Sequence, residues 1–329
     1  MTGSRAAEHL GHQFRLTDLE PELGSFREEV LQGLQKAQKE LPSKFFYDEW
    51  GSHLFEQICA LDEYYLTRTE LGIMRDHASE MAQLLGPQCL LVEYGSGSST
   101  KTRLLLNHLL QPAAYVPIDI SKEHLIQAAM ALVAAYPDLE VLPVCADYTT
   151  KFELPMPTAP ATRRVVYYPG STIGNFDRAP ALRFLRHIAG VCGPGGGLLI
   201  GVDLRKDPGK LHHAYNDWEG VTAAFNLNLL ARINRELAAD FPLDHFRHYA
   251  FYNPRAGRVE MHLVSLANQT VHVGDAAFSF EIGESIWTES SYKYRLDEFA
   301  DLARAAGLAV EQVWTDPQAL FSVQYLTVV

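Results

Sequence analysis

The stretch that decides the fold is Cys89-Leu-Leu-Val-Glu-Tyr-Gly-Ser-Gly-Ser-Ser-Thr100. It begins as an apolar run with the length of a buried strand, and Gly95 and Gly97 follow directly before a segment of helical character. A strand that ends in a glycine turn and enters a helix lies at the carboxyl edge of an open α/β sheet, where such folds bind ligands. The dinucleotide fingerprint needs a third glycine where this chain has Thr100, so a nicotinamide site is disfavoured.

A regular alternation of short apolar runs and helix-like segments surrounds this stretch. Runs spaced by enough residues for a crossover helix are typical of βαβ units and a parallel sheet. We expect strands at Cys89–Tyr94, Tyr115–Ile120, Glu140–Cys145, Arg164–Tyr168 and Gly197–Asp203, with helices at Lys101–Leu110 and Leu125–Ala135. Ser98-Ser99-Thr100 and Ser121 mark the helix starts. The chain is therefore predicted to form an α/β, doubly wound sheet.

The alternation of apolar runs and helix-like segments stops after Asp203 and returns only near Leu296. Between them the sequence predicts a helix, Thr222–Leu237, and then strands at Val259–Leu266, Thr270–Val273 and Ala277–Ile282. The end of the chain predicts a helix over Leu296–Ala306 and strands at Ala309–Trp314 and Phe321–Val329. Residues 206–294 thus look inserted. The segment before Thr69 has no place in the predicted sheet either, so we expect the two to pack together as a second, α+β domain, with the active site in the cleft between the domains. The division is 1–68 plus 206–294 against 69–205 plus 295–329.

Composition narrows the function classes. The 329 residues carry 28 Lys and Arg against 40 Asp and Glu, a formal net charge of −12, which disfavours nucleic-acid and membrane-surface roles. The four cysteines show no CxxC pair, and no apolar run approaches the length of a bilayer span or an export signal. His212-His213 and the other histidines lack metal-ligand spacing, so no metal is predicted. We expect a cytoplasmic protein.

Acidic residues recur where successive strands end. Glu93 precedes the glycine turn, Asp119 ends the next strand, and Asp147 with Tyr148 follows the third. A carboxylate at the second strand end can accept both ribose hydroxyls of a nucleotide. Each acid alone is more typical of a helix cap, but together, with no pyrophosphate cradle, they favour S-adenosylmethionine, a cation that carboxylates and aromatic faces attract.

Several further motifs carry a resemblance over most of the chain, from about Leu41 to the end. They are Lys44–Ser52, Phe55–Ile58, Glu63–Glu70, Gly95-Ser96-Gly97 with Lys101-Thr102-Arg103, and Gly170–Asn175. Together they resemble the histidine Nα-methyltransferases that make hercynine in ergothioneine biosynthesis. The resemblance implies a class I methyltransferase, Rossmann-like fold, in which the main domain binds S-adenosylmethionine and the second domain binds the substrate.

The resemblance also implies roles for single residues on the cofactor side. The loop at Gly95 and the helix-start Lys101 would hold the methionine part of the cofactor, and Tyr64 would reach its carboxylate. Asp119 would bind the ribose, and Asp147 with Tyr148 the adenine.

On the substrate side, the family pattern places Asn175 and Tyr215 at the amino acid's carboxylate and amine. Tyr47, Phe55 and Gly170 would line the methyl-transfer chamber, and Tyr47, Asn175 and Tyr215 would be the catalytic residues. Glu289 and Ser291 match the pair that reads the imidazole, and Met261 matches a pocket wall. Residues at i and i+2 of an extended segment share one face, so Glu289 and Ser291 can both point into the cleft.

The function predicted from these residues is S-adenosylmethionine-dependent trimethylation of the α-amine of L-histidine to hercynine, by a monomer that acts on small molecules. One alternative keeps the cofactor and changes the substrate to another aromatic amino acid such as tryptophan. Glu289 and Ser291 argue against it, because an indole offers one N–H and no acceptor. A nicotinamide-dependent or nucleotide-sensing module is a further alternative, disfavoured by Thr100.

Overall fold

Strand β3 (Cys89–Tyr94) lies within a mixed sheet in the computed structural model, which describes residues 13–19, 24–97, 100–148 and 152–329. Within these ranges the sheet has eight strands, in the spatial order β1 (Thr17–Asp18), β5 (Val144–Cys145), β4 (Ala114–Asp119), β3, β6 (Arg163–Tyr168), β7 (Gly197–Asp203), β14 (Phe321–Val328) and β13 (Leu308–Thr315). All neighbours from β1 to β7 are parallel, and β14 is antiparallel to both β7 and β13. This order confirms the predicted doubly wound, class I methyltransferase fold.

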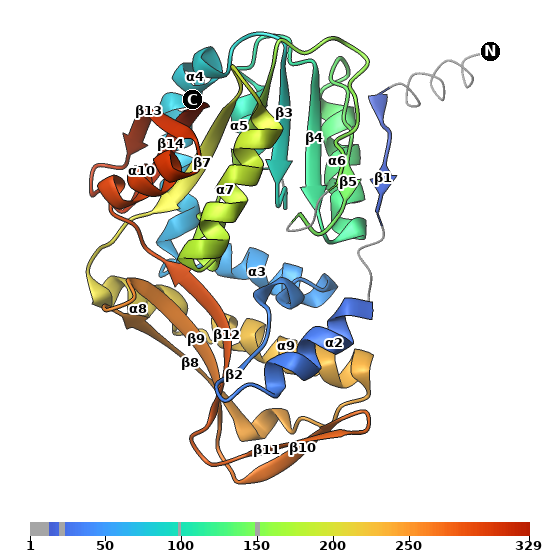
Figure 1. Cartoon of the computed structure of the whole chain (residues 1–329), viewed down its shortest axis with the longest axis vertical. Coiled ribbons are helices and arrows are strands. Elements are labelled where there is room, and N and C mark those ends of the chain that lie inside the picture. Colours follow the sequence, from blue (N-terminus) through green and yellow to red (C-terminus); the bar gives the residue numbers. More distant parts are fainter. Residues whose placement is uncertain (1–12, 20–23, 98–99, 149–151) are drawn as a thin grey trace, which may run out of the picture.

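Alternate residues of β3 face opposite layers of helices. Leu90 and Val92 pack in one core with α7 (Arg178–Cys192) and α10 (Leu296–Ala305), while Cys89 and Leu91 pack in the other. Helices α4 (Tyr65–Leu85), α5 (Thr100–Leu106) and α6 (Lys122–Ala135) supply that second core. Figure 1 shows α7 in front of the sheet. Burial on both faces explains why these strands read as continuous apolar runs.

A second group of elements packs below the carboxyl edge of the main sheet (Figure 1). Its four-stranded sheet has the order β2 (Lys39–Glu40), β12 (Ser285–Tyr292), β9 (Arg258–Ser265) and β8 (Phe246–Asn253). Its helices are α2 (Gly24–Leu34), α3 (Glu49–Ala60), α8 (Pro208–Tyr215) and α9 (Val221–Leu237). Strands β10 (Gln269–Val273) and β11 (Ala276–Phe280) form a separate hairpin. One core joins side chains from residues 26–66 with others from 211–286, so the early segment and the insertion do pack together.

Three expectations about the main sheet need correction. Thr17–Asp18 pairs in parallel with Val144–Cys145, so the early segment does contribute an edge strand. The third strand covers only Val144–Cys145 rather than 140–145, because Pro143 has no N–H to donate to a ladder. Helix α5 ends at Leu106, four residues earlier than expected. The predicted helix-start residues Ser98 and Ser99 lie outside the described residues.

The sequence predicts no strand at β8, and at β12 it predicts only an extended segment around Glu289 and Ser291. Both are rich in polar and aromatic residues, and each buries only part of its side chains, so neither shows the clean alternation that marks a strand.

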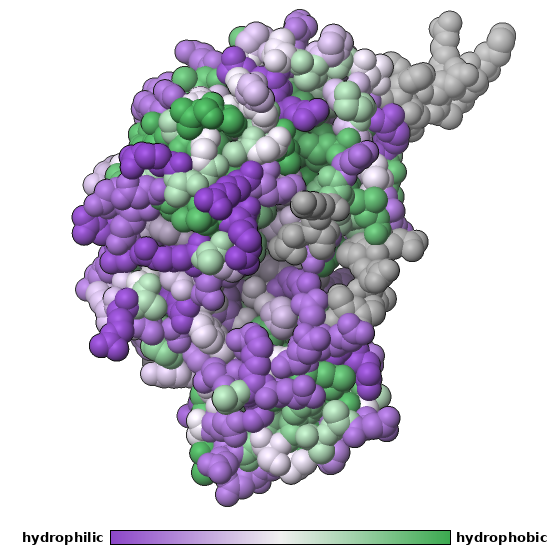
Figure 2. All heavy atoms as spheres, in the orientation of Figure 1, coloured by the Kyte–Doolittle hydropathy of each residue, from purple (hydrophilic) through white to green (hydrophobic). Residues whose placement is uncertain are grey.

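On the face shown in Figure 2, hydrophilic residues cover much of the surface, and hydrophobic residues lie between them in separate groups. Among the residues that the structure describes, no helix is long and apolar enough to cross a membrane.

Gly201 on β7 leaves the space that a buried carboxylate occupies. A Cβ at this position would lie 2.2 Å from Glu70 Oε1, and Glu70 on α4 is fully buried. We expect Gly201→Ala to lower the free energy of unfolding by about 1–3 kcal/mol, the usual cost of overpacking a tight core. Urea denaturation measures this change.

Gly72 offers a matched control on the same helix as Glu70. A Cβ there meets nothing within 4 Å, and alanine is the better helix former by about 1 kcal/mol. Gly72→Ala should therefore leave the stability unchanged or raise it. An equal loss of stability in both variants would show that the space beside Glu70 is not the constraint.

Candidate active site

Two adjoining cavities lie where the two groups of elements meet. The larger, of about 610 Å³, runs along the carboxyl ends of β3 and β4, and the smaller chamber has about 60 Å³. All residues predicted for the cofactor line the larger cavity: Tyr64, Gly95, Lys101, Asp119, Asp147 and Tyr148. All residues predicted for the substrate line the chamber: Tyr47, Phe55, Gly170, Asn175, Tyr215, Met261, Glu289 and Ser291. Tyr47, Phe55, Tyr64, Gly170 and Asn175 line both.

The glycine turn after β3 is shaped by backbone conformations that suit glycine. Gly95 has φ +73° and Gly97 has φ +47°, in the left-handed region that side-chain-bearing residues rarely adopt. The turn is tied to β4, because the Gly95 amide donates to the Ile118 carbonyl at 2.8 Å. The Ser96 hydroxyl is buried in the cavity wall and has no hydrogen-bond partner among the described residues. A polar ligand in the cavity would supply one.

Asp119 at the end of β4 is held by two backbone amides. Gly97 N donates to Oδ2 at 3.2 Å, and Ser121 N donates to Oδ1 at 3.0 Å. Burial raises the pKa of Asp119, while these amides act in the opposite direction. The carboxylate is therefore oriented by the turn and still has oxygen lone pairs for a ligand, since each oxygen can accept more than one hydrogen bond.

Asp147 is engaged by a lysine from the second group of elements. Lys44, in the 3₁₀ turn η1 (Ser43–Phe46), places Nζ 3.0 Å from Asp147 Oδ2 and 3.0 Å from Glu29 Oε1. The adjacent Tyr148 packs edge-on against Tyr94, with ring centroids 5.7 Å apart. An ion pair therefore closes this end of the cavity beside an aromatic face.

Lys101 is paired with the buried Glu70, and the Gly170 amide donates to the same carboxylate at 3.0 Å. Gly170 has φ +75°, and a Cβ there would lie 3.5 Å from Lys101 Nζ. Glu70 thus fixes a cation and a backbone turn at the boundary of the two cavities.

Glu93 departs from the expected pattern of acids around the ligand. Its carboxylate accepts hydrogen bonds from Thr102 Oγ1 at 2.5 Å and from the Tyr115 hydroxyl at 2.6 Å. Burial raises its pKa to about 7. Although Glu93 lines the cavity, these two donors show that it supports the start of α5 and the β3–β4 pair.

The residues present fit S-adenosylmethionine. The cavity volume is in the range of about 300–1,000 Å³ typical of small-molecule sites. Its wall combines carboxylates, aromatic faces and an orphaned serine hydroxyl, which suit a molecule with both a nucleoside and a cationic end.

Aromatic rings form the wall between cavity and chamber. Tyr47 packs edge-on against Phe55, with ring centroids 5.6 Å apart, and against Phe225 of α9, with centroids 5.8 Å apart. The ring centroid of Tyr64 lies 6.4 Å from that of Phe55 and 6.3 Å from that of Tyr215. Burial raises the pKa values of Tyr47 and Tyr64 well above the usual tyrosine value, so both phenols stay protonated near neutral pH.

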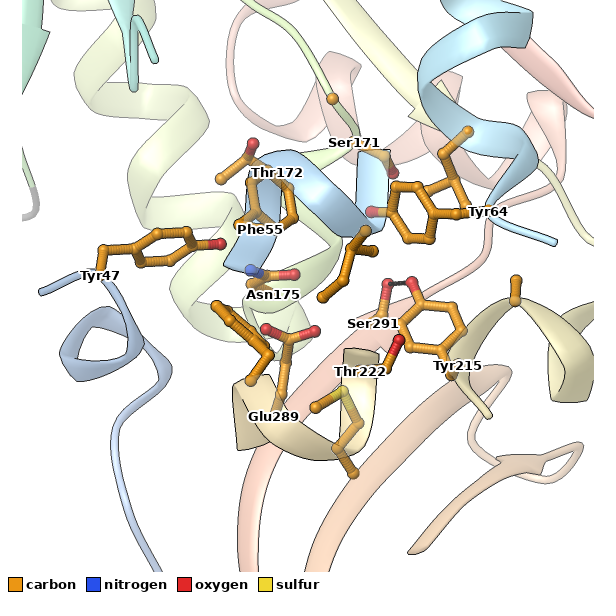
Figure 3. Close-up of a pocket in the computed structure, with 16 residues that line it drawn as sticks. Tyr47, Phe55, Tyr64, Ser171, Thr172, Asn175, Tyr215, Thr222, Glu289 and Ser291 are labelled. Carbon is orange, nitrogen blue, oxygen red and sulfur yellow. Dashed lines mark hydrogen bonds between the residues drawn. The ribbon is translucent and has the colours of Figure 1, made fainter. Parts of the chain in front are cut away.

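Asn175 ends the 3₁₀ turn η2 (Thr172–Asn175), which follows β6 and packs on β12. Gly174 allows that approach, because a Cβ there would lie 2.8 Å from the Tyr292 carbonyl oxygen. The turn therefore brings Asn175 from the main sheet to the strand that carries Glu289 and Ser291, and Figure 3 shows these side chains around one chamber.

A β-bulge between Trp287 and Glu289 orients the polar end of the chamber. Ile286 is buried in the core of the second group of elements, and strict alternation from it would turn Glu289 to the opposite face. The extra residue shifts the alternation, so Glu289 and Ser291 line the chamber together, and Met261 pairs with Glu289 from β9. Burial raises the pKa of Glu289 to about 7, partly offset by Lys293.

Lys44, Glu70, Phe225 and Lys293 are among the residues at the site for which the sequence predicts no role. Lys44 and Glu70 lie in the motifs that carry the resemblance, but nothing in their spacing shows their partners. Phe225 looks like one apolar position among several on α9. Lys293 donates to Tyr215 and Ser291, and the i, i+2 spacing that joins Glu289 and Ser291 could have indicated it.

No group of His, Cys, Asp and Glu suited to a metal ion occurs among the described residues.

Comparisons with known proteins agree with this geometry. A family model described as "Histidine-specific methyltransferase, SAM-dependent" matches residues 26–328. The chain is 43% identical over 305 residues to a histidine N-alpha-methyltransferase of Mycolicibacterium smegmatis, covering 91% of this chain and 94% of that one. It is 32% identical over 295 residues to ergothioneine biosynthesis protein 1 of Neurospora crassa, covering 84% of this chain and 32% of that one. The chain belongs to the histidine-specific, S-adenosylmethionine-dependent methyltransferases.

Proposed function

We propose that this protein transfers three methyl groups in turn to the α-amine of L-histidine and so forms hercynine for ergothioneine biosynthesis. The observation that carries the proposal is the small chamber that shares an aromatic wall with the larger cavity and has one carboxylate and one hydroxyl, Glu289 and Ser291, in its lining. An imidazole has one N–H donor and one acceptor nitrogen, and this pair can satisfy both.

When bound, S-adenosylmethionine supplies an activated methyl group on its sulfonium. Asp119 would accept hydrogen bonds from the ribose, and Asp147 with Tyr148 would meet the adenine. Lys101 and Tyr64 would hold the methionine carboxylate, with Lys101 kept in place by Glu70. The Gly95 turn would allow the ligand to approach the backbone closely, because Gly95 has no side chain in the way. The space that a Cβ would take there is open, with only Tyr148 within reach, at 4.0 Å.

The chamber would hold the amino acid by its two ends. Glu289 and Ser291 would bind the ring beside Met261, and Asn175 and Tyr215 would bind the carboxylate and amine. The amine would then face the wall shared with the larger cavity, near Tyr47, Phe55 and Gly170. Alignment of this kind can supply on the order of 7–11 kcal/mol of the barrier.

The amine must lose a proton before it can attack. Tyr47 is protonated near neutral pH, because burial raises its pKa, so its phenolate is unsuited as the base. We infer that the proton passes to water, and that Tyr47 and Phe55 stabilise the growing cation through their ring faces.

We also propose that residues 1–68 plus 206–294 act as a substrate-binding domain and 69–205 plus 295–329 as the cofactor-binding domain, in a cytoplasmic monomer that needs neither nucleic acid nor membrane. Support comes from the separate cores of the two groups and from the net charge of −12. Two details limit the division: β1 pairs with the main sheet, and the boundary at residue 68 falls inside α4.

The direct test is mass spectrometry of L-histidine incubated with the protein and S-adenosylmethionine. Products heavier by one, two and three methyl groups should appear, with the added methyl groups on the α-nitrogen. Absence of any methylated histidine, with the protein folded and S-adenosylhomocysteine bound, would refute the proposal.

Asp119→Ala should weaken binding of S-adenosylhomocysteine by about 10- to 150-fold for each hydrogen bond to the ribose that is lost, because a charge-assisted hydrogen bond is worth about 1.5–3 kcal/mol. Calorimetry measures the affinity. Asp138→Ala, on an exposed turn, is the control and should bind like the wild type. Equal affinities in the two variants would remove Asp119 from the site.

Activity should fall steeply as the pH is lowered from 8 to 6. Because the pKa of the α-amine is near 8 or above, the reactive neutral form decreases by about 50- to 100-fold over this range. Glu289, with its pKa raised to about 7, also loses its charge as the pH falls and binds the imidazole N–H less well. Rates at saturating cofactor test this. A flat profile with methyl transfer limiting would show that amine deprotonation is not in control.

Glu289→Gln should stabilise the ligand-free protein at pH 8 and not at pH 5. The pKa of Glu289 is about 7 in the folded protein against 4.5 for the free group, so the native state binds more protons between these values and loses stability as the pH rises. Glutamine carries no charge to bury, and the melting temperature at pH 8 should rise by several degrees. Glu281→Gln, at an exposed position, should change neither; an equal gain at pH 5 and 8 would contradict the expectation.

A further inference from the structure

Lys293 is fully buried behind the chamber, and all three of its N–H donors are used. Nζ lies 2.8 Å from Asp203 Oδ2, 2.9 Å from the Tyr215 hydroxyl and 2.8 Å from Ser291 Oγ. Tyr215 and Ser291 line the chamber, whereas Asp203 and Lys293 do not. The lysine therefore acts on two pocket hydroxyls without lining the pocket itself.

The charge of Lys293 is not needed to neutralise Asp203. Lys206 Nζ lies 2.5 Å from Asp203 Oδ1, and the Tyr65 hydroxyl donates to the same carboxylate at 2.8 and 3.0 Å. One carboxylate thus faces two ammonium groups, and Lys293 directs its other two N–H donors at Tyr215 and Ser291.

The two lysines differ in their titration. Burial lowers the pKa of Lys206 to about 8, in spite of Asp203. Burial also acts to lower the pKa of Lys293, but Asp203 and Tyr215 outweigh it and hold that pKa above the usual lysine value. Lys293 is therefore charged throughout the working pH range.

An ammonium group can only donate, so both hydroxyl oxygens must accept from Lys293. The Tyr215 hydroxyl also donates to Ser291 Oγ at 2.8 Å, the contact drawn in Figure 3. Ser291 Oγ then accepts two hydrogen bonds, which fills both lone pairs. Its own proton is left to point at a ligand.

We propose that Lys293 is a positioning residue that, together with Tyr215, makes the Ser291 hydroxyl a donor toward the substrate, so that this part of the chamber selects a group that accepts a hydrogen bond. The inference rests on the proposed function and deepens it. The selected group is the unprotonated ring nitrogen of histidine at Ser291. A ring that presents only N–H or C–H at Ser291 leaves a buried donor unpaired.

Lys293→Met is the test variant, and Lys206→Met is its matched control. Each removes one ammonium from Asp203 and leaves the other, but only Lys293 touches the pocket hydroxyls. The substrates are L-histidine and the two pyrrole analogues of histidine, which carry one ring N–H and no acceptor nitrogen. kcat and KM are measured for each at saturating cofactor, with S-adenosylhomocysteine affinity as the check on folding.

The wild type should prefer histidine over the better pyrrole analogue by about 10–100-fold, the value of one buried hydrogen bond. In Lys293→Met this preference should fall to within a few-fold, through a higher KM for histidine, while Lys206→Met keeps it. Should Lys293→Met fail to fold, Lys293→Gln, with a neutral donor in the same place, is used and should retain part of the preference.

Two outcomes would overturn the inference. One is a histidine preference that survives in both lysine variants. The other is an equal fall of kcat/KM for all substrates in both variants, which would show a structural effect only. Failure of the proposed function gives a different result, because then the wild type itself methylates no histidine.

Discussion

The buried ion pair between Asp203 and Lys293 sits where the chain leaves the main sheet and where it comes back. Strand β7 ends at Asp203, and β12 ends one residue before Lys293. The two crossings also share backbone contacts, since Tyr294 N donates to the Asp203 carbonyl at 3.0 Å and Leu204 forms a bridge with Tyr294. Removing Asp203 would leave the buried Lys293 ammonium without its counter-ion, a loss that costs about 3–5 kcal/mol. The pair therefore fixes the strand that carries Ser291 against the carboxyl edge of the sheet.

The position of that strand lets one site draw on both halves of the molecule. Most residues predicted for the cofactor lie at the carboxyl ends of β3, β4 and β5 or at the start of α5, where a doubly wound sheet binds ligands, while Tyr64 precedes α4. Those predicted for the substrate lie in or beside η1, α3, α8, β9 and β12 of the second group of elements, apart from Gly170 and Asn175, which follow β6. The turn η2 reaches across to pack on β12 through Gly174. The shared wall of Tyr47, Phe55, Tyr64, Gly170 and Asn175 is where a methyl donor and an acceptor would meet.

Much of this could be predicted from the sequence, because apolar runs and glycine turns are local signals. The parallel strands and the facing of Glu289 and Ser291 are of that kind, although the facing also depends on a bulge that no periodicity shows. The short third strand follows from Pro143, a residue inside the apolar run that has no N–H to donate. Ion pairs between residues far apart in the sequence could not be predicted in this way. Glu70 pairs with Lys101, 31 residues away, and Asp203 pairs with Lys293, 90 residues away. The spacing of such residues does not indicate that they are partners.

The chamber separates two problems that one polar pocket could not solve together. Recognition of the ring is left to buried polar groups, which discriminate strongly because a wrong ligand leaves them unpaired. The amine loses a donor with each methyl group it gains, so a strong fixed acceptor beside it would bind each successive form less well. Aromatic faces attract a cation whatever its number of N–H groups, and the rings of Tyr47, Phe55 and Tyr64 occupy that part of the wall. In the proposed binding mode, polar groups beside the ring and aromatic rings beside the amine would thus allow one pocket to hold every intermediate from the free amine to the trimethylated product.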